Sequence, residues 1–269
     1  MTDIVRIVHH TGGVAEVILN RPDKMNALAP DMFTALIDAG QSLITNTSVR
    51  AVVLRGEGRA FCAGLDLVNF ENMKAGIDMI DPARLTERTH GDANKFQRVA
   101  TVWRDIPVPV IAALHGVAFG GGLQIALGAD IRLVAADIKM SIMEIKWGLV
   151  PDMAGMLFLR QLVRADVVRD LIYTGRIVDG AEAVALGLAT RVVDDPLASA
   201  VQLAQEMTQK SPLALRAAKR MLNQWGDASD AALLLAEADE QSRLIGRAEQ
   251  MEAVQANLDK RLPVFHDPE

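Results

Sequence analysis

Short runs of β-branched and other apolar residues occupy much of the first half of the chain. Their lengths predict six strands, over residues 4–8, 14–19, 51–54, 108–114, 131–134 and 138–142. Gly12 and Gly13 separate the first two runs, which is the pattern of a β-hairpin. Apolar residues at helical spacing follow Pro30, and a further helix is predicted over 89–103.

From residue 153 onward the apolar positions recur almost entirely at helical spacing. They predict helices over residues 153–163, 165–173, 196–208, 213–224 and 230–256. The last one combines Leu-rich turns with many charges, so we expect it to fold back on its own domain or to pack against another subunit. Residues 71–86 have mixed polarity and no clear period, and we interpret them as a mobile substrate-side loop or an irregular helix.

Two turns rich in small residues each follow a predicted strand. They are FCAGLD at 61–66 and GGG at 120–122, and the second opens a predicted helix over 123–129. Glycines allow positive φ and close approach of a substrate, and the first turn of a helix leaves N–H groups without partners. Such a turn can donate hydrogen bonds to negative oxygen. The recurrence of strand, turn and helix favours a coil of ββα units over a doubly wound sheet.

Two other uses of the glycine-rich turn are excluded or disfavoured by its sequence. Ile125 stands where a dinucleotide fingerprint has its third glycine, and no Gly-Lys-Ser/Thr follows, so both nucleotide-phosphate patterns fail. Residues 106–129 carry no charge and are long enough to span a membrane. Their two prolines, five glycines, His115 and Gln124 argue against a lipid-facing helix.

Composition narrows the class of protein further. A chain of 269 residues that is 50% apolar can bury a large core, and a net charge of −6 argues against a nucleic-acid partner. The N-terminal residues lack a secretory signal pattern, and the single cysteine, Cys62, fits a reducing cytoplasm. The five histidines have no metal-ligand spacing with one another or with Cys62, so we expect no metal site.

The acids nearest to the glycine-rich turn are the candidates for chemistry. Two strand-ending turns could bring two backbone N–H groups to one point, which is the arrangement that stabilises an oxyanion on a thioester carbonyl. Gln124 lies just inside the helix that the glycines open, and Glu144 and Asp152 follow downstream. Spacing alone leaves open whether Glu144 is solvated or catalytic.

Several motifs at ordered positions carry a family resemblance. They are NRP at 20–22, NAL at 26–28, FCAGLD at 61–66, HGVAFGGG at 115–122 and GLVP at 148–151. Together they resemble the crotonase family, also called the enoyl-CoA hydratase/isomerases. The resemblance continues through later segments and covers nearly the whole chain.

The resemblance implies an α/β crotonase (ClpP-like) spiral of ββα repeats over residues 1–195, followed by a C-terminal helical trimerisation region over 196–269. It implies a homotrimer or a homohexamer made of two trimers. The implied substrate is an acyl-CoA thioester, so coenzyme A is part of the substrate and no separate cofactor is expected. The implied oxyanion donors are the backbone N–H groups of Leu65 and Gly121. The implied CoA-binding residues are Met25, Ala27, Ala63, Gly64, Asp66 and, toward a neighbouring subunit, Lys260 and Phe265.

The chain departs from the family pattern at the catalytic acids. The two glutamates of a family hydratase fall on Gln124 and Glu144, and a glutamine cannot take up or release a proton near neutral pH. A single glutamate is similar to many of the family's double-bond isomerases, and dienoyl-CoA isomerases also have an acid at the position of Asp152. Isomerisation is therefore the preferred expectation, and hydration is the second.

Two further readings stay open. Asp152 also matches the nucleophile of the 4-chlorobenzoyl-CoA dehalogenases, although His90, the nearest candidate for their base, lies several residues from the matching position. A non-catalytic acyl-CoA-binding protein of the same fold is the other alternative.

Overall fold

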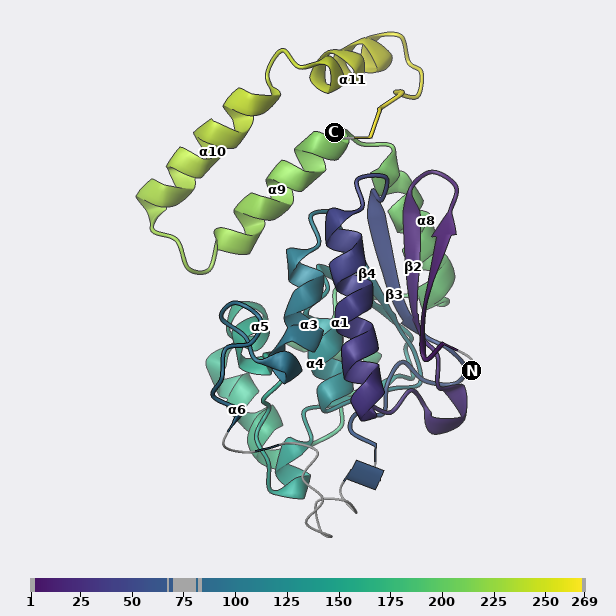
Figure 1. Ribbon diagram of the computed structural model, residues 1–269, viewed down its shortest axis with the longest axis vertical. Coiled ribbons are helices and arrows are strands. Elements are labelled where there is room, and N and C mark those ends of the chain that lie inside the picture. Colours follow the sequence, from purple (N-terminus) through teal and green to yellow (C-terminus); the bar gives the residue numbers. More distant parts are fainter. Residues whose placement is uncertain (1–2, 67, 70–80, 82–83, 268–269) are drawn as a thin grey trace.

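The computed structural model describes residues 3–66, 68–69, 81 and 84–267, so most of the segment predicted at 71–86 lies outside the described residues. In the described part, five of the six predicted strands belong to one six-stranded sheet, and the strand predicted over 138–142 pairs in a smaller sheet (Figure 1). In spatial order the strands of the large sheet are β1 (Val5–His10), β2 (Val14–Leu19), β3 (Ala51–Gly56), β4 (Val110–Leu114), β6 (Ile131–Val134) and β8 (Arg191–Val192), of which β8 was not predicted. Only β1 pairs antiparallel, through the predicted hairpin, and the other pairs are parallel.

A second, smaller sheet lies at the carboxyl ends of the parallel strands. It contains β5 (Val117–Phe119) and β7 (Lys139–Ser141), and isolated bridges join Cys62 to Ala118 and Leu28 to Leu65 beside it. The segments after β3, β4 and β6 therefore each extend into this second layer before the chain returns. This arrangement confirms the coil of ββα units, because spatial order in the large sheet follows chain order.

The large sheet is buried on both faces, which explains why its central strands are almost wholly apolar. Helices α1 (Pro30–Thr45) and α3 (Lys95–Asp105) cover one face, and α8 (Pro196–Thr208) covers the other (Figure 1). Residues of α8 share a core with β2, β3, β4 and β6. The boundary predicted at residue 195 stays a prediction, but α8 packs with the strands rather than with the helices that follow it.

The remaining helices position the site and the C-terminal region. They are η1 (Pro22–Lys24), α4 (Gly121–Leu127), η3 (Glu144–Trp147), α5 (Gly155–Leu162), α6 (Ala165–Thr174), α7 (Gly180–Leu186), α9 (Pro212–Gln224), α10 (Asp230–Leu244) and α11 (Ala248–Leu258). The sequence pattern did not predict α7. Along the described residues, no helix combines the length and the apolar character that crossing a membrane requires.

Two predicted helix boundaries are wrong for local reasons. The helix expected from residue 89 begins at Lys95, because Asn94 and Gln97 form a capping box that ends the preceding irregular segment. The single helix expected over 230–256 is two helices, α10 and α11. Gly246, with φ +75°, lies between them and takes a left-handed conformation that ends the helical path.

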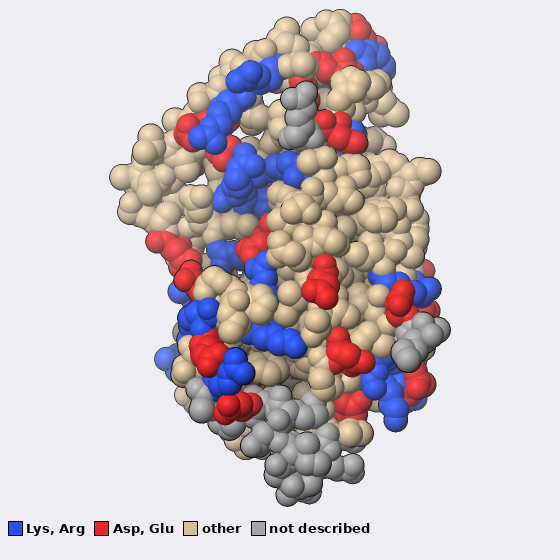
Figure 2. All heavy atoms as spheres, in the orientation of Figure 1, with Lys and Arg blue, Asp and Glu red and all other residues tan. Residues whose placement is uncertain are grey.

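Buried and exposed cations attach the C-terminal helices to the sheet. Lys219 of α9 is 5% exposed; its Nζ lies 2.7 Å from Asp130 Oδ2 and also donates to the carbonyls of Trp103 and Val108. Its burial lowers the pKa of this ammonium group. On the face shown in Figure 2, basic side chains gather where the C-terminal helices meet the rest of the chain, with acidic side chains among them.

Candidate active site

The two predicted glycine turns lie in direct contact. Phe119 N donates to Cys62 O at 3.1 Å, and Cys62 N donates to Val117 O at the same distance. Gly64 has φ +86°, and a Cβ placed on it would lie 2.7 Å from Phe119 O and 3.9 Å from Gly121 N. The turn after β3 therefore needs glycine at position 64 for two reasons: its backbone conformation and its contact with the turn after β5.

The peptide orientations point the N–H groups of both predicted oxyanion donors away from the turn or helix to which each belongs. The carbonyl of Gly64 accepts from Leu28 N, and the carbonyl of Gly120 accepts from Gln124 N. All described peptide bonds are trans, so the N–H groups of Leu65 and Gly121 point opposite to these carbonyls. Among the described residues, neither amide donates to another backbone group. Two unpaired donors from contacting turns are what a developing oxyanion requires.

Glu144 lies beside these turns at the start of η3. It is 8% exposed, and a Cβ placed on Gly120 would lie 3.3 Å from its Oε1 atom. Gln124 Nε2 donates to the same Oε1 atom at 2.6 Å. The other oxygen, Oε2, is buried and has no hydrogen-bond partner in the described structure. Burial raises the pKa of this carboxyl, which is the behaviour of a group used to exchange protons near neutral pH.

Asp152 lies on the segment that leads into α5. The residue is exposed overall, yet protein atoms around its carboxyl raise the pKa of that group through desolvation. Its charge also contributes to the raised pKa of Glu144. The next residue, Met153, is buried against the second turn, because a Cβ on Gly121 would lie 2.7 Å from Met153 Sδ. The structure thus brings Gln124, Glu144 and Asp152 to the glycine turns.

If Glu144 acts as a base, the pH dependence of turnover should follow its pKa. A base acts when ionised, so kcat/KM should rise with pH through a pKa above the ordinary glutamate value and level off at higher pH. Asp152→Asn removes a negative charge that raises this pKa, so the acidic limb should move to lower pH. Pre-steady-state or steady-state pH profiles of both proteins measure this shift. An unchanged limb would show that Asp152 does not act on Glu144.

The five CoA-binding residues predicted near the site lie on two backbone segments that are hydrogen-bonded to each other. Ala63 N donates to Met25 O at 2.9 Å, and Asp66 N donates to Leu28 O at 3.2 Å. Met25 has φ +47°, and Ala27 is buried. Met25, Ala27, Ala63, Gly64 and Asp66 are therefore brought together by the structure.

Arg21 is a residue of this region that sequence reasoning did not single out. Its guanidinium lies 3.0 Å from Asp66 Oδ2 and also donates to Ala27 O, so it links the two predicted CoA-binding segments. Asn26 is fully buried and accepts from Arg21 N while it donates to Ala60 O. The NRP and NAL motifs contained both residues, but only their contacts reveal this bridging role.

Lys260 and Phe265 do not join the other candidate residues within one chain. Phe265 O accepts from Arg50 Nη2 at 2.8 Å, and Arg50 precedes β3, whereas the glycine turn follows the other end of that strand. Lys260 is exposed after α11, with φ +55°. Their predicted role was toward a neighbouring subunit's CoA, and it stays a prediction.

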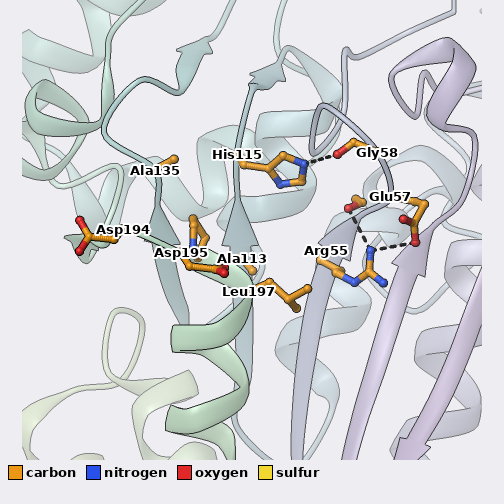
Figure 3. Close-up of a pocket in the computed structure, with 11 residues that line it drawn as sticks. Arg55, Glu57, Gly58, Ala113, His115, Ala135, Asp194, Asp195 and Leu197 are labelled. Atoms are coloured by element: carbon orange, nitrogen blue, oxygen red, sulfur yellow. Dashed lines mark hydrogen bonds and ion pairs between the residues drawn. The ribbon is translucent and has the colours of Figure 1, made fainter.

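A separate hollow lies at the carboxyl ends of β3 and β4, beside the start of α8 (Figure 3). None of the candidate site residues lines it. Figure 3 shows Arg55 bound to Glu57, and His115 Nε2 lies 2.8 Å from Gly58 O. Arg55, Glu57 and His115 are thus held by structural contacts, so the chemistry of the chain is better placed at the glycine turns than in this hollow.

Neither the cysteine nor the histidines offer a second kind of chemistry in the described structure. Cys62 is fully buried, its thiol donates to Asn26 O at 3.1 Å, and burial raises its pKa to about 12. A thiol held this way is not a nucleophile near neutral pH. Among the residues that the structure describes, no group of three or more His, Cys, Asp or Glu side chains could hold a metal ion.

Comparison with known proteins decides the family. The family model for enoyl-CoA hydratase/isomerase matches residues 9–268. The chain belongs to the enoyl-CoA hydratase/isomerase family. Mitochondrial methylglutaconyl-CoA hydratase of Mus musculus is 31% identical over 98% of this chain and 83% of the relative. Mitochondrial enoyl-CoA hydratase domain-containing protein 2 of Bos taurus is 32% identical over 94% of this chain and 84% of the relative.

Solved structures of this family share the fold. The enoyl-CoA hydratase of Bacillus anthracis superposes with a TM-score of 0.87 at 26% identity, covering 97% of this chain and 98% of that one. The expected crotonase spiral is thereby confirmed as the fold. The protein is a crotonase-family enzyme, a hydratase or an isomerase.

Proposed function

We propose that this family member shifts a carbon–carbon double bond in an unsaturated acyl-CoA thioester, with coenzyme A as part of the substrate and no separate cofactor. The observation that carries the proposal is the pairing of one buried carboxylate, Glu144, with the neutral amide of Gln124 at 2.6 Å. One carboxylate can move a proton between two carbons. The site has no second carboxylate at position 124 that could activate a water together with Glu144.

In the proposed reaction, Glu144 takes a proton from the carbon next to the thioester of a 3-enoyl-CoA. The C–H electron pair then delocalises into a dienolate, and negative charge develops on the thioester oxygen between the amides of Leu65 and Gly121. The same proton returns to the γ carbon, so that the double bond moves into conjugation. For a dienoyl substrate, Asp152 is the candidate for the second proton transfer, because its raised pKa also suits proton exchange.

Hydration of a 2-enoyl-CoA is the second candidate function, because the relatives described above bear hydratase names. It requires a proton acceptor and a donor for water at the site, and Asp152 is the only other candidate acid for that role. The dehalogenase alternative has less support. His90 Nδ1 lies 2.9 Å from Thr89 Oγ1 in an exposed segment, and no described contact links it to Asp152.

A substrate comparison tests the proposal. Purified enzyme should be assayed side by side with 3-enoyl-, 3,5-dienoyl- and 2-enoyl-CoA of the same chain length. We expect double-bond shift to exceed water addition by at least about 10-fold in kcat/KM, since loss of one general acid–base partner costs roughly 10²–10⁴ in rate. Faster hydration than isomerisation would reverse the order of the two candidates. Binding without turnover of any substrate would support a non-catalytic role.

We further propose a homotrimer, or a dimer of trimers, in the cytoplasm. Support for assembly comes from large apolar side chains exposed on the C-terminal helices of the single chain, namely Leu222, Trp225, Leu234, Leu235, Met251 and Leu258. Support for the compartment comes from one free, buried cysteine. Sedimentation of the purified protein tests the first part.

A further inference from the structure

The side-chain amide of Gln124 can take only one orientation. The residue is 1% exposed, and its Oε1 atom accepts from Met153 N and from Gly155 N, each at 2.9 Å. If the amide were reversed, its NH₂ group would face the N–H groups of Met153 and Gly155, and none of these three donor groups would have an acceptor. The NH₂ group must therefore face Glu144, to which it donates at 2.6 Å.

This orientation removes Gln124 as an acceptor for water. Both lone pairs of its Oε1 atom are already used by backbone N–H groups. The amide can thus neither accept a proton nor accept a hydrogen bond from a water at the site. Gln124 therefore cannot act as the base that activates a water.

The same contact makes the two oxygens of Glu144 unequal. Oε1 is held by Gln124, whereas Oε2 is buried without a partner in the described structure. A hydrogen bond donated to Oε1 favours the ionised carboxylate and fixes the orientation of the carboxyl group. Gln124 therefore sets which way the Glu144 carboxyl faces.

Gln124 also holds the segment that carries Asp152. Ala154 has φ +66°, a left-handed conformation that a residue with a side chain rarely adopts, and the two N–H groups that flank it are the donors to Gln124. Packing there is tight, since a Cβ on Gly155 would lie 2.7 Å from Gln124 Oε1. Asp152 directly precedes this turn, so one side chain sets the placement of both candidate acids.

We infer that Gln124 is a positioning residue that fixes the orientation of the Glu144 carboxyl, holds the 153–155 turn, and thereby selects double-bond shift over water addition. The inference deepens the proposed function and rests on it for its consequence in catalysis. Its structural part concerns the carboxyl of Glu144 alone and can be measured without substrate.

The first test uses Gln124→Ala, with Gln202→Ala as the matched control. Gln202 also donates to a glutamate, Glu206, but on the exposed surface of α8. Gln124→Ala should lower kcat for double-bond shift about 10²-fold with little change in KM, since misplaced catalytic groups cost about that much. The acidic limb of the pH profile of this variant should move to higher pH. The hydrogen bond from Gln124 lowers the pKa of Glu144 in the native protein, and the variant lacks it. The control should change neither quantity.

The second test uses Gln124→Glu, which keeps two acceptor lone pairs for the N–H groups of Met153 and Gly155 and so preserves the turn. The new carboxyl supplies the missing acid–base partner, so the ratio of hydration to double-bond shift should rise at least about 10-fold. An unchanged ratio would overturn the selective role of Gln124.

Carboxyl-detected NMR titration separates this inference from the proposed function. The Glu144 resonance, assigned with Glu144→Gln, should titrate at higher pH in Gln124→Ala than in the native protein. Equal titration in the two proteins would overturn the positioning role, whatever the activity. A native protein that shifts no double bond, but in which Glu144 still responds to Gln124→Ala, would contradict the proposed function and leave the positioning role standing.

Discussion

Replacing Glu144 with Gln is expected to lower kcat for double-bond shift by roughly 10²–10⁴, with acyl-CoA binding retained. The substitution keeps the size of the side chain and, among the described residues, removes the only carboxylate that lies both beside Gly120 and in contact with Gln124. The thioester would still reach the backbone amides of the two glycine turns. Stopped-flow assays of turnover, together with calorimetric binding of a non-reactive acyl-CoA, measure the two quantities separately.

Glu240→Gln is a matched control for this result. Glu240 is also 8% exposed, but it lies in α10 and pairs with Arg220. Removing its charge tests the general effect of neutralising a buried glutamate, and turnover per active site should remain within about 2-fold because the residue lies outside the site. Activity of Glu144→Gln equal to that of the native enzyme would contradict the role of Glu144 as the proton carrier.

Gly64→Ala is expected to produce the second large loss. Its Cβ would lie 2.7 Å from Phe119 O, a backbone atom that cannot move without displacing the second turn. Separating the turns moves the N–H groups of Leu65 and Gly121 apart, and loss of one oxyanion donor costs about 10²–10³ in kcat. The effect should fall on kcat more than on KM, because the charge on the thioester oxygen is largest in the transition state.

The Gly12→Ala variant separates the effect of moving the two turns apart from the effect of backbone strain. Gly12 has φ +83°, close to the +86° of Gly64, and a Cβ there would meet only Thr208 Oγ1 at 4.0 Å. Both variants should lose about 1 kcal/mol of unfolding free energy from the unfavourable conformation, measured by urea denaturation, and Gly64→Ala should lose more because its Cβ also meets Phe119 O. Only Gly64→Ala should lose activity in the folded protein. Equal kcat values for the two variants would argue against an oxyanion site formed by these turns.

The amide of Gln124 shows how one side chain can change what a shared fold does. A glutamate at this position could accept the same two N–H groups and still offer a carboxyl oxygen to a water. The glutamine uses its single oxygen for the backbone and presents a donor to Glu144. The difference between an acceptor and a donor, facing one buried carboxylate, is the physical basis of the proposed preference for double-bond shift over hydration.

Local patterns in the sequence determined the elements and their order. Apolar runs predicted the strands, the recurrence of turn and helix predicted the ββα coil, and the motifs around residues 61–66 and 115–122 indicated the family. These features depend on side chains within a few positions of each other, so they can be read along the chain. Helix ends were less predictable, because Asn94 and Gly246 act through cap geometry and backbone conformation.

Only the tertiary structure decided which atoms meet. Gln124, Glu144 and Met153 lie far apart in sequence, and nothing along the chain specifies that one amide joins the other two. Arg21 likewise acquires its bridging role through contacts with Ala27 and Asp66. The reason is physical: hydrogen-bond direction and burial depend on distances between folded elements, whereas sequence pattern records only the preference of each segment for its own conformation.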